Sequence, residues 1–169
     1  VDIGSNDGNL LSNFKQIRRL GVTPEDIGKL AIKKGIPTLL KYFDKNTANF
    51  IQKKYGKAKI ITATNVFAHI DNITELMNNV LKVLKNDGVF VTESHYLMPL
   101  IKDLQYDTIY HEHLRYYSLT SLKNIFDKFK LEIIHAKEIP THGGSIRVYV
   151  AKKNNYKKSK SIKKILNKE

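Results

Sequence analysis

The sequence of 169 residues contains no cysteine, which excludes disulfides, thiolate zinc sites and cysteine nucleophiles within this chain. No apolar run approaches the roughly 18 residues that a membrane span requires, and no secretory signal opens the sequence. These absences predict a protein of the reducing cytoplasm with no membrane partner. With 41% hydrophobic and 27% charged residues, the chain has the composition of a globular domain.

The start of the chain lies inside an apolar, strand-like run, Val1-Asp2-Ile3. A domain rarely begins within a strand, so we expect a fragment whose N-terminal part is missing. The remaining length still suffices for one domain with a sizeable core.

The charge is strongly basic, with 29 Lys and Arg against 16 Asp and Glu and a net charge of +13. Basic proteins often bind phosphate, either in nucleic acid or in a nucleotide-linked small molecule. The lysines are spread over most segments, which indicates that residues 1–151 are basic because the whole protein is rich in lysine. Aromatic residues are absent from most of residues 152–169, which argues against base stacking there. Ile162, Ile165 and Leu166 predict a helix with one apolar face. We expect residues 152–169 to be the basic, helical start of a further C-terminal domain, so that this face lacks part of its partner.

Short apolar runs alternate with helical patterns along the chain. The strand-like runs cover residues 1–3, 20–22, 36–40, 58–63, 89–93, 131–135 and 146–151. The helical patterns cover residues 10–18, 24–35, 46–55, 71–84 and 98–130, the last with an aromatic-rich interruption at 106–117. This alternation predicts an α/β fold with a mainly parallel sheet, and the last two strands predict an antiparallel pair at one edge.

A glycine-bounded loop, Gly4-Ser5-Asn6-Asp7-Gly8, follows the first strand. It is not the dinucleotide fingerprint, because Asn6 stands where that fingerprint has its middle glycine, and the chain has no Gly-Lys-Ser/Thr for nucleotide phosphates. Together with Asp2, the loop suits a ligand without a pyrophosphate, such as S-adenosylmethionine (SAM). A structural tight turn explains the loop nearly as well.

Four segments occur in order and are more distinctive together than the loop is alone. They are residues 1–8 (VDIGSNDG), 65–70 (NVFAHI), 107–114 (DTIYHEHL) and 141–148 (THGGSIRV). Together they resemble the SAM-dependent sugar C-methyltransferases, which methylate a carbon of a nucleotide-linked 4-keto-deoxysugar. The resemblance implies a class I methyltransferase (Rossmann-like) fold over residues 1–151, a seven-stranded, mainly parallel sheet with helices on both faces. In that family a zinc-binding domain precedes this region and a further domain follows it, so the chain looks like a central catalytic fragment with zinc only in an upstream domain.

The resemblance also implies roles for individual residues. Methylation of a carbon beside a ketone needs a base for the α-proton, a donor for the enolate oxygen and a sulfonium methyl in line with the carbanion. His113 would be the base, because a neutral imidazole suits this task, and Tyr110 would donate to the enolate; their spacing shares one face if the segment is helical. The implied catalytic residues are His113, Tyr110, Glu112 and His69. The implied SAM-binding residues are Asp2, Gly4, Ser5, Asp7, Gly8, Thr23 and Asn65, and the implied sugar-binding residues are Asn65, Tyr96, His142 and Gly143.

A metal site in the His111-Glu112-His113 run is not expected, because an i, i+2 spacing does not place two histidines on one helical face. His142-Gly143-Gly144 is equally consistent with a plain turn. The charge also raises a nucleic-acid methyltransferase as an alternative. Such enzymes that act on exocyclic amines commonly carry an Asn/Asp-Pro-Pro-aromatic motif after the fourth strand, and residues 64–67 (TNVF) have no proline.

Three positions depart from the family's pattern. Thr23 stands where an acidic residue usually holds the ribose hydroxyls, Ser94-His95 replaces an apolar residue and proline, and Arg115 replaces a small residue. A threonine hydroxyl cannot chelate a diol as a carboxylate does, although Glu25 or Asp26 could substitute. A non-catalytic relative that binds a sugar nucleotide is therefore a second alternative.

Overall fold

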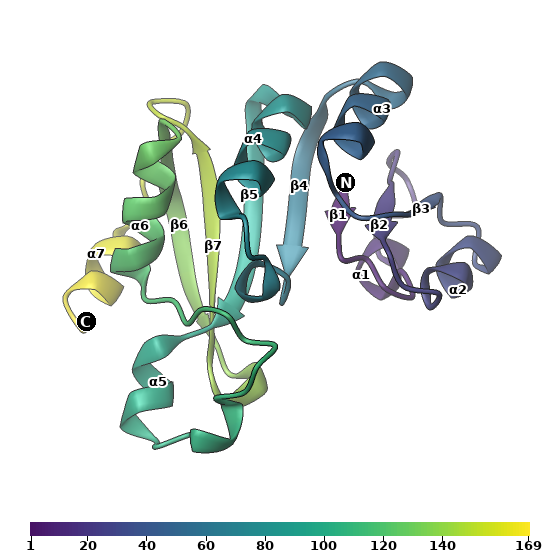
Figure 1. The fold of residues 1–169 in the computed structure, drawn as a ribbon. Helices are drawn as coiled ribbons and strands as arrows, with labels where there is room; N and C mark the ends of the chain where they lie inside the picture. The colour runs from purple at the N-terminus through teal and green to yellow at the C-terminus, as the bar shows by residue number, and fades with distance from the viewer.

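The seven strands form one sheet in the order β3-β2-β1-β4-β5-β7-β6 in the computed structural model, which describes residues 1–169 (Figure 1). The strands are β1 (Asp2–Ile3), β2 (Gly21–Thr23), β3 (Thr38–Leu40), β4 (Ala58–Thr64), β5 (Leu84–His95), β6 (Leu131–Ile139) and β7 (Ser145–Lys152). Strands β1 to β5 pair in parallel, whereas β7 runs antiparallel to both β5 and β6. The predicted sheet and its antiparallel edge pair are confirmed.

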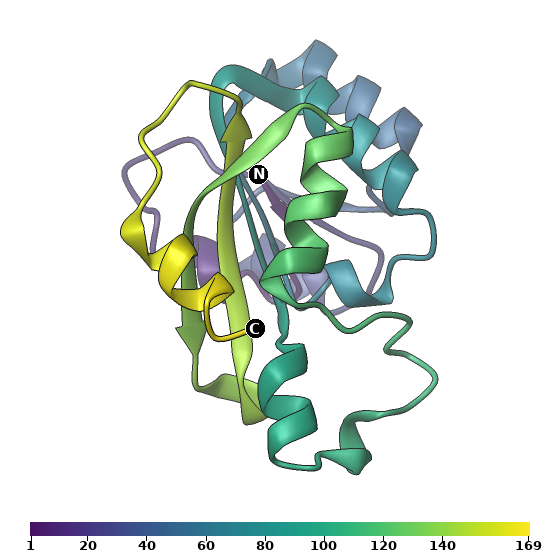
Figure 2. The same ribbon diagram turned by 90° about the vertical axis from the view of Figure 1, so that its left-hand side faces the viewer.

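Helices lie on both sides of this sheet. They are α1 (Asn9–Ser12), α2 (Gly28–Lys33), α3 (Lys45–Tyr55), α4 (Ile73–Val83), α5 (Leu97–Lys102), α6 (Leu119–Lys128) and α7 (Lys160–Leu166). Figure 2 shows α3, α4 and α6 together on one side, and α1 and α7 on the other. No helix of the structure is both long and apolar enough to cross a membrane.

The main core lies under α3, α4 and α6. Polar side chains start these helices: Asp44 accepts a hydrogen bond from the Thr47 N–H, and Asn72 accepts one from the Glu75 N–H. Their apolar faces then pack on the sheet around the fully buried rings of Phe67, Phe90 and Phe126. The other face of the sheet is less covered, as the 47% exposure of Ile60 on β4 shows. That open face leaves room for a cavity above the central strands.

Three helical predictions were wrong in extent. The helix expected over residues 10–18 ends after Ser12, since Phe14 and Ile17 are 40% and 58% exposed and have no core to pack against. The helix expected from Pro24 begins only at Gly28, after a turn in which the Gly28 N–H donates to the Glu25 carbonyl. Between α5 and α6 the chain is irregular, so the segment around Tyr110 is not helical.

Helix α7 confirms the helix predicted within residues 152–169. Ile165 is buried, and the partly buried Ile162 and Leu166 pack against the main core, so this face has a partner within the chain. The Glu169 carboxylate adds to this anchoring, because it accepts hydrogen bonds from the N–H groups of Leu119 and Thr120 at the start of α6. Assignment of residues 152–169 to a further domain stays a prediction.

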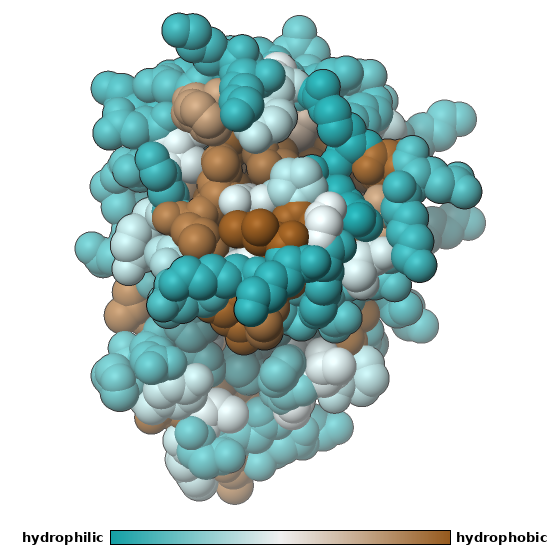
Figure 3. Space-filling model, turned by 90° about the vertical axis from the view of Figure 1, so that its right-hand side faces the viewer, coloured by the Kyte–Doolittle hydropathy of each residue, from teal (hydrophilic) through white to brown (hydrophobic).

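An apolar surface lies at the side of the molecule that carries β1, β2 and β3. Figure 3 shows it as a brown area within a frame of hydrophilic side chains. Phe14, Ile17, Ile51 and Tyr55 line a cavity of about 450 Å³ in this part of the chain. Its wall contains no carboxylate or histidine, so it offers no side chain that exchanges protons near neutral pH. The candidate functional site is therefore the larger cavity described next.

Candidate functional site

A cavity of about 980 Å³ opens at the carboxyl ends of β1, β2 and β4. Open α/β sheets bind their ligands at this edge, where the loops after the strands converge. The cavity wall includes seven of the residues predicted from the sequence, Asp2, Gly4, Ser5, Asp7, Thr23, Asn65 and His69. Gly8 is not in the wall: a Cβ there would lie 2.8 Å from the Ala31 Cβ, so this glycine permits packing of the loop on α2.

Gly4 lets the loop after β1 pass close to the loop after β4. Its φ of +73° lies in the left-handed region that favours glycine, and a Cβ at this position would overlap the Cγ2 methyl of Val66. The backbone angle and the contact with Val66 thus both require a residue without a Cβ at position 4. With glycine there, the backbone of the loop can also approach a ligand in the cavity closely.

Three buried polar atoms in the wall have no hydrogen-bond partner within the protein. They are the hydroxyl oxygens of Ser5 and Thr23 and the side-chain oxygen of Asn65. Buried polar atoms are almost always paired in folded proteins. Their position in the wall fits a ligand with several hydroxyl and amine groups, such as the ribose and aminocarboxylate of SAM.

Asp2 lies beneath the loop and accepts a hydrogen bond from the Thr62 hydroxyl at 2.6 Å. Burial raises the pKa of its carboxyl group to about 6, against the lowering effect of the Thr62 hydrogen bond. The carboxylate is therefore poised to become fully ionised when a cation binds beside it.

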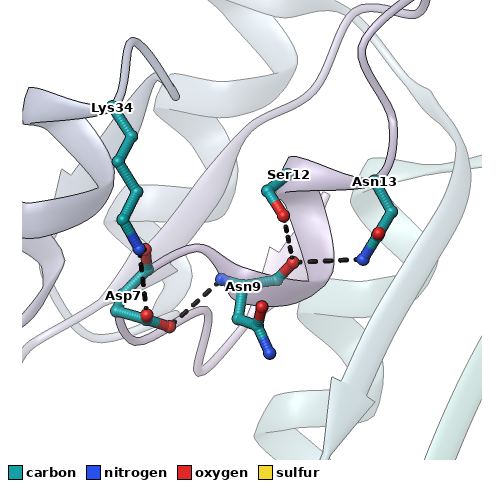
Figure 4. A network of polar contacts seen from close by, with 5 residues as sticks. All are labelled: Asp7, Asn9, Ser12, Asn13 and Lys34. Atoms are coloured by element: carbon teal, nitrogen blue, oxygen red, sulfur yellow. Dashed lines mark hydrogen bonds and ion pairs between the residues drawn. The ribbon is translucent and has the colours of Figure 1, made fainter.

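Asp7 holds the loop at the rim of the cavity (Figure 4). Its carboxylate accepts hydrogen bonds from the Asn9 N–H at 3.1 Å and from Lys34 Nζ at 3.0 Å. The hydrogen bond from Lys34 lowers the pKa of Asp7, so the group stays ionised at neutral pH. The structure thus gives Asp7 a loop-holding role in addition to its place in the wall.

The charge of the cavity wall is opposite in sign to that of the chain. Two basic side chains, those of Lys41 and Arg147, lie in the wall. The acidic side chains there are those of Asp2, Asp7, Glu25, Asp44 and Glu75. Such a wall favours a cationic ligand and disfavours a polyanion.

A cluster of imidazole rings adjoins the cavity and centres on His113. The Nδ1 atom of His113 lies 2.9 Å from the Thr108 carbonyl oxygen, and Nε2 lies 3.1 Å from the Tyr110 hydroxyl. Because a carbonyl can only accept, Nδ1 is the donor to Thr108, which leaves Nε2 to accept from the Tyr110 hydroxyl. Tyr110 and His113 therefore meet, as their spacing predicts for a helix, although a loop rather than a helix brings them together.

His69 connects this cluster with the cavity. Its ring centroid is 5.0 Å from that of His113, and its Nδ1 lies 2.8 Å from the Glu112 carbonyl oxygen. Arg115 fixes the same loops, since its guanidinium donates to the carbonyl oxygens of Ile70 and Asp71 at 2.5 and 2.9 Å. This contact explains the basic residue at a position where the family usually has a small one.

Besides Gly8, Tyr110 and His113, four of the predicted residues lie outside the cavity wall. Tyr96 is only 2% exposed, and its hydroxyl donates to Glu169, so its side chain points away from the cavity. The side chain of Glu112 is exposed, and only its backbone contacts His69. His142 and Gly143 lie in the loop before β7, where the Gly143 carbonyl accepts a hydrogen bond from Gln105.

Two features of the site were missed in the sequence. Glu93 and Arg147 form a 2.6 Å ion pair between β5 and β7, with Glu93 buried and Arg147 in the cavity wall. His95, two residues after Glu93 on β5, brings its ring centroid to 4.7 Å from that of His113. The period of two along a strand places His95 on the same face as Glu93, a signal that could have revealed it.

The strand order, the glycine-containing loop after β1 and the cavity at the carboxyl edge define the class I SAM-dependent methyltransferase fold. Comparison with known families agrees: the chain belongs to the methyltransferase-domain family, whose model matches residues 1–136.

Among curated proteins, the chain is similar to the C-methyltransferase NovU of Streptomyces niveus, with 37% identity over 154 residues. The match covers 89% of this chain and 37% of NovU, so the chain spans well under half the length of that relative. Among solved structures, it is similar to a SAM-dependent methyltransferase from Clostridium acetobutylicum, with a TM-score of 0.68, 16% identity and coverage of 89% of this chain and 82% of that one. The magnesium protoporphyrin IX methyltransferase of Synechocystis, solved with bound SAH, gives a TM-score of 0.66, 11% identity and coverage of 89% and 72%.

Proposed function

We propose that this chain is the catalytic part of a SAM-dependent C-methyltransferase that acts on a nucleotide-linked keto-deoxysugar. The observation that supports it most is the Tyr110–His113 pair beside a cavity suited to SAM, with His113 Nε2 at 3.1 Å from the Tyr110 hydroxyl and Nδ1 at 2.9 Å from the Thr108 carbonyl oxygen. NovU, a C-methyltransferase, supports transfer to carbon. The absence of proline from residues 64–67 (TNVF), where methyltransferases of exocyclic amines commonly have two, argues against the nucleic-acid alternative that the net charge raised.

SAM, when bound, supplies an electrophilic methyl group on a cationic sulfur. We infer that Asp2 and the loop residues Gly4 and Ser5 hold its aminocarboxylate end, because the Asp2 carboxylate can pair with the amine and the Ser5 hydroxyl lacks a partner. Thr23 would lie nearest the ribose, as predicted from its place after β2. Asn65 would contact either ligand from the loop after β4.

In the proposed reaction, His113 Nε2 takes the proton from the carbon next to the ketone. The Thr108 carbonyl holds the other ring nitrogen as a donor, which keeps the lone pair on Nε2. The Tyr110 hydroxyl, which donates to Nε2 in this structure, would turn to the enolate oxygen when the sugar binds. His69 would line the sugar side of the cavity, and Glu112, His142 and Gly143 remain predicted sugar contacts.

The direct test is incubation of the protein with methyl-labelled SAM and a panel of dTDP-4-keto-deoxysugars, followed by mass spectrometry. We expect label on a carbon next to the ketone. SAM binding without any methylated product, measured in the full-length protein, would favour the non-catalytic relative. Methylated DNA or RNA in a parallel reaction would instead support the nucleic-acid enzyme.

SAM affinity should depend on pH through Asp2. The pKa of about 6 in the folded protein lies above the usual value for Asp, so the folded state binds this proton more tightly than the unfolded chain does. The group therefore stabilises the fold increasingly as pH falls through that value. SAM binding needs the ionised form, and we expect its affinity to fall about tenfold per pH unit below pH 6. Calorimetric titrations between pH 5 and 8 measure this, and Asp2→Asn should give weak binding with a flat profile. A wild-type profile as flat as that of the variant would contradict the assignment.

Glu25 should take over part of the role that an acidic residue at position 23 usually has. Glu25 lies in the cavity wall, whereas the neighbouring Asp26 lies outside it and pairs with Lys29 at 2.7 Å. We expect Glu25→Gln to weaken SAM binding about tenfold, the loss of one charge-assisted hydrogen bond. Asp26→Asn is the matched control and should leave binding unchanged. Equal effects of the two substitutions on calorimetric affinity would show that Glu25 does not reach the ribose.

A further inference from the structure

Arg147 lies in the cavity wall, and the proposed reaction gives it no role. Its side chain is 38% exposed, whereas that of Glu93, its neighbour across β5 and β7, is 5% exposed. The Glu93 carboxylate accepts a hydrogen bond from Arg147 Nε at 2.6 Å. A guanidinium group has further N–H donors on its two Nη atoms, and only Nε donates to a carboxylate here. The buried carboxylate therefore holds the side chain in the wall and leaves its Nη groups to a ligand.

The charges of the cavity wall are divided along the sheet. Four of its five carboxylates belong to β1 or to the loops after β1, β2 and β3, namely those of Asp2, Asp7, Glu25 and Asp44. Lys41, the other basic side chain of the wall, belongs to the loop after β3 as well. Arg147 comes from β7, which β4 and β5 separate from β1. The acidic part of the wall suits the cationic SAM, and the part around Arg147 suits an anionic group.

The pairing of β5 and β7 sets the position of Arg147 relative to the proposed base. Arg147 pairs with Glu93 and His95 pairs with Ser145, so Arg147 and His95 are diagonal neighbours on one face of the sheet. Such neighbours lie roughly 7–8 Å apart, within reach of long side chains. The ring centroid of His95 is 4.7 Å from that of His113. A ligand that extends from His113 to Arg147 therefore needs its anionic group close to its reacting carbon.

We propose that Arg147 binds the phosphate that links the sugar to its nucleotide, and thereby determines which carbon of the sugar faces the base. The inference rests on the proposed function, because it takes a nucleotide-linked sugar as the substrate. In such a substrate the phosphate is attached to the sugar ring itself, at the anomeric carbon. A planar guanidinium group can donate two parallel hydrogen bonds to one phosphate. Glu93 restrains the guanidinium before the phosphate arrives, which reduces the entropy lost on binding.

The test is a calorimetric titration of the 169-residue chain with dTDP, which has the phosphates of the substrate but no sugar that could be methylated. We expect Arg147→Gln to weaken dTDP binding about tenfold or more, because a charge-assisted contact is lost. Arg147→Lys should weaken it as well, since an ammonium group keeps the charge but cannot donate the two parallel hydrogen bonds. Lys152→Gln is the matched control and should leave dTDP affinity unchanged. Lys152 lies on the same strand, outside the cavity wall, and donates to Asn86.

SAM titrations of the same proteins show whether Arg147 binds the phosphate or the carboxylate of SAM. We expect SAM affinity to stay within about twofold in Arg147→Lys, which keeps a cation beside the buried Glu93 and so preserves the fold if Arg147→Gln does not. Loss of SAM affinity with unchanged dTDP affinity in this variant overturns the proposal.

Two further results overturn it: dTDP affinity of Arg147→Lys equal to that of the unsubstituted chain, and no dTDP binding by the unsubstituted chain. Since dTDP binding does not require catalysis, failure of the keto-sugar reaction and failure of the Arg147 assignment are distinguishable. Arg147-dependent dTDP binding without methylation of any keto sugar would contradict the proposed reaction and support the phosphate contact.

Discussion

Replacement of His113 by asparagine is expected to lower the methylation rate by about 10²–10⁴-fold, the usual contribution of a general base. Asparagine can still donate a hydrogen bond to the Thr108 carbonyl, which His113 Nδ1 contacts at 2.9 Å, so the loop should keep its shape. It has no lone pair of suitable basicity to replace Nε2. Exchange of the α-proton of the keto sugar in deuterated water, followed by NMR, measures the lost step directly.

The cofactor side of the site supplies the control for this result. His113 is not in the wall of the cavity, so SAM affinity of His113→Asn should stay within about twofold of the unsubstituted protein. Tyr110→Phe should slow methylation less, because it removes one hydrogen bond to the developing oxyanion and leaves the base intact. Undiminished α-proton exchange in His113→Asn would place the base elsewhere, with His69 the next candidate. Undiminished exchange in the His69 variant as well would rule out the keto-sugar mechanism.

The arrangement of the sheet could be predicted because most of its strands are recognisable as short apolar runs in the sequence. Apolar runs such as residues 58–63 and 146–151 are bounded by glycine, asparagine or helical patterns, and they occur in the order that an α/β fold requires. The short helix α1 could not be predicted, because the spacing of Phe14 and Ile17 is helical whether or not a surface exists for them to pack against. The periodicity of apolar residues shows which side chains could share one face of a helix, whereas tertiary contacts determine whether the helix forms.

The same contrast holds at the end of β5, where two neighbouring residues have opposite surroundings. The motif resemblance favoured Tyr96 as a sugar contact, yet its hydroxyl donates a hydrogen bond to the last residue, Glu169, and not to a group in the cavity wall. His95 points to the cluster instead, since successive side chains of a strand face opposite ways. Tyr110 and His113 come together in a loop, where a hydrogen bond from His113 Nδ1 to the Thr108 carbonyl holds the imidazole ring. The spacing of residues in the sequence does not predict this contact.

Replacement of Gly4 by alanine should nearly abolish SAM binding, with a loss of affinity of about 10²-fold or more. Alanine at a φ of +73° costs about 1–2 kcal/mol in the left-handed region. The new methyl group would also overlap the Val66 Cγ2 atom, and Val66 belongs to the same cavity wall. The loop after β1 must therefore move away from the loop after β4, which separates the two parts of the proposed SAM site. Calorimetric titration with SAM measures the loss.

A substitution at Gly35 separates the backbone cost from the cost of the overlap with Val66. Gly35 has nearly the same φ, +72°, but no atom lies within 4 Å of a new Cβ there. Gly35→Ala should lower the free energy of unfolding by about 1–2 kcal/mol and leave SAM affinity unchanged. In the Gly4→Ala, Val66→Ala double variant the overlap is removed while the backbone cost stays, so we expect SAM binding to recover in part. Thermal unfolding with and without SAM, measured on all three proteins, tests this division. If Gly4→Ala loses no more SAM affinity than Gly35→Ala, close approach of this loop to the loop after β4 does not form the cofactor site.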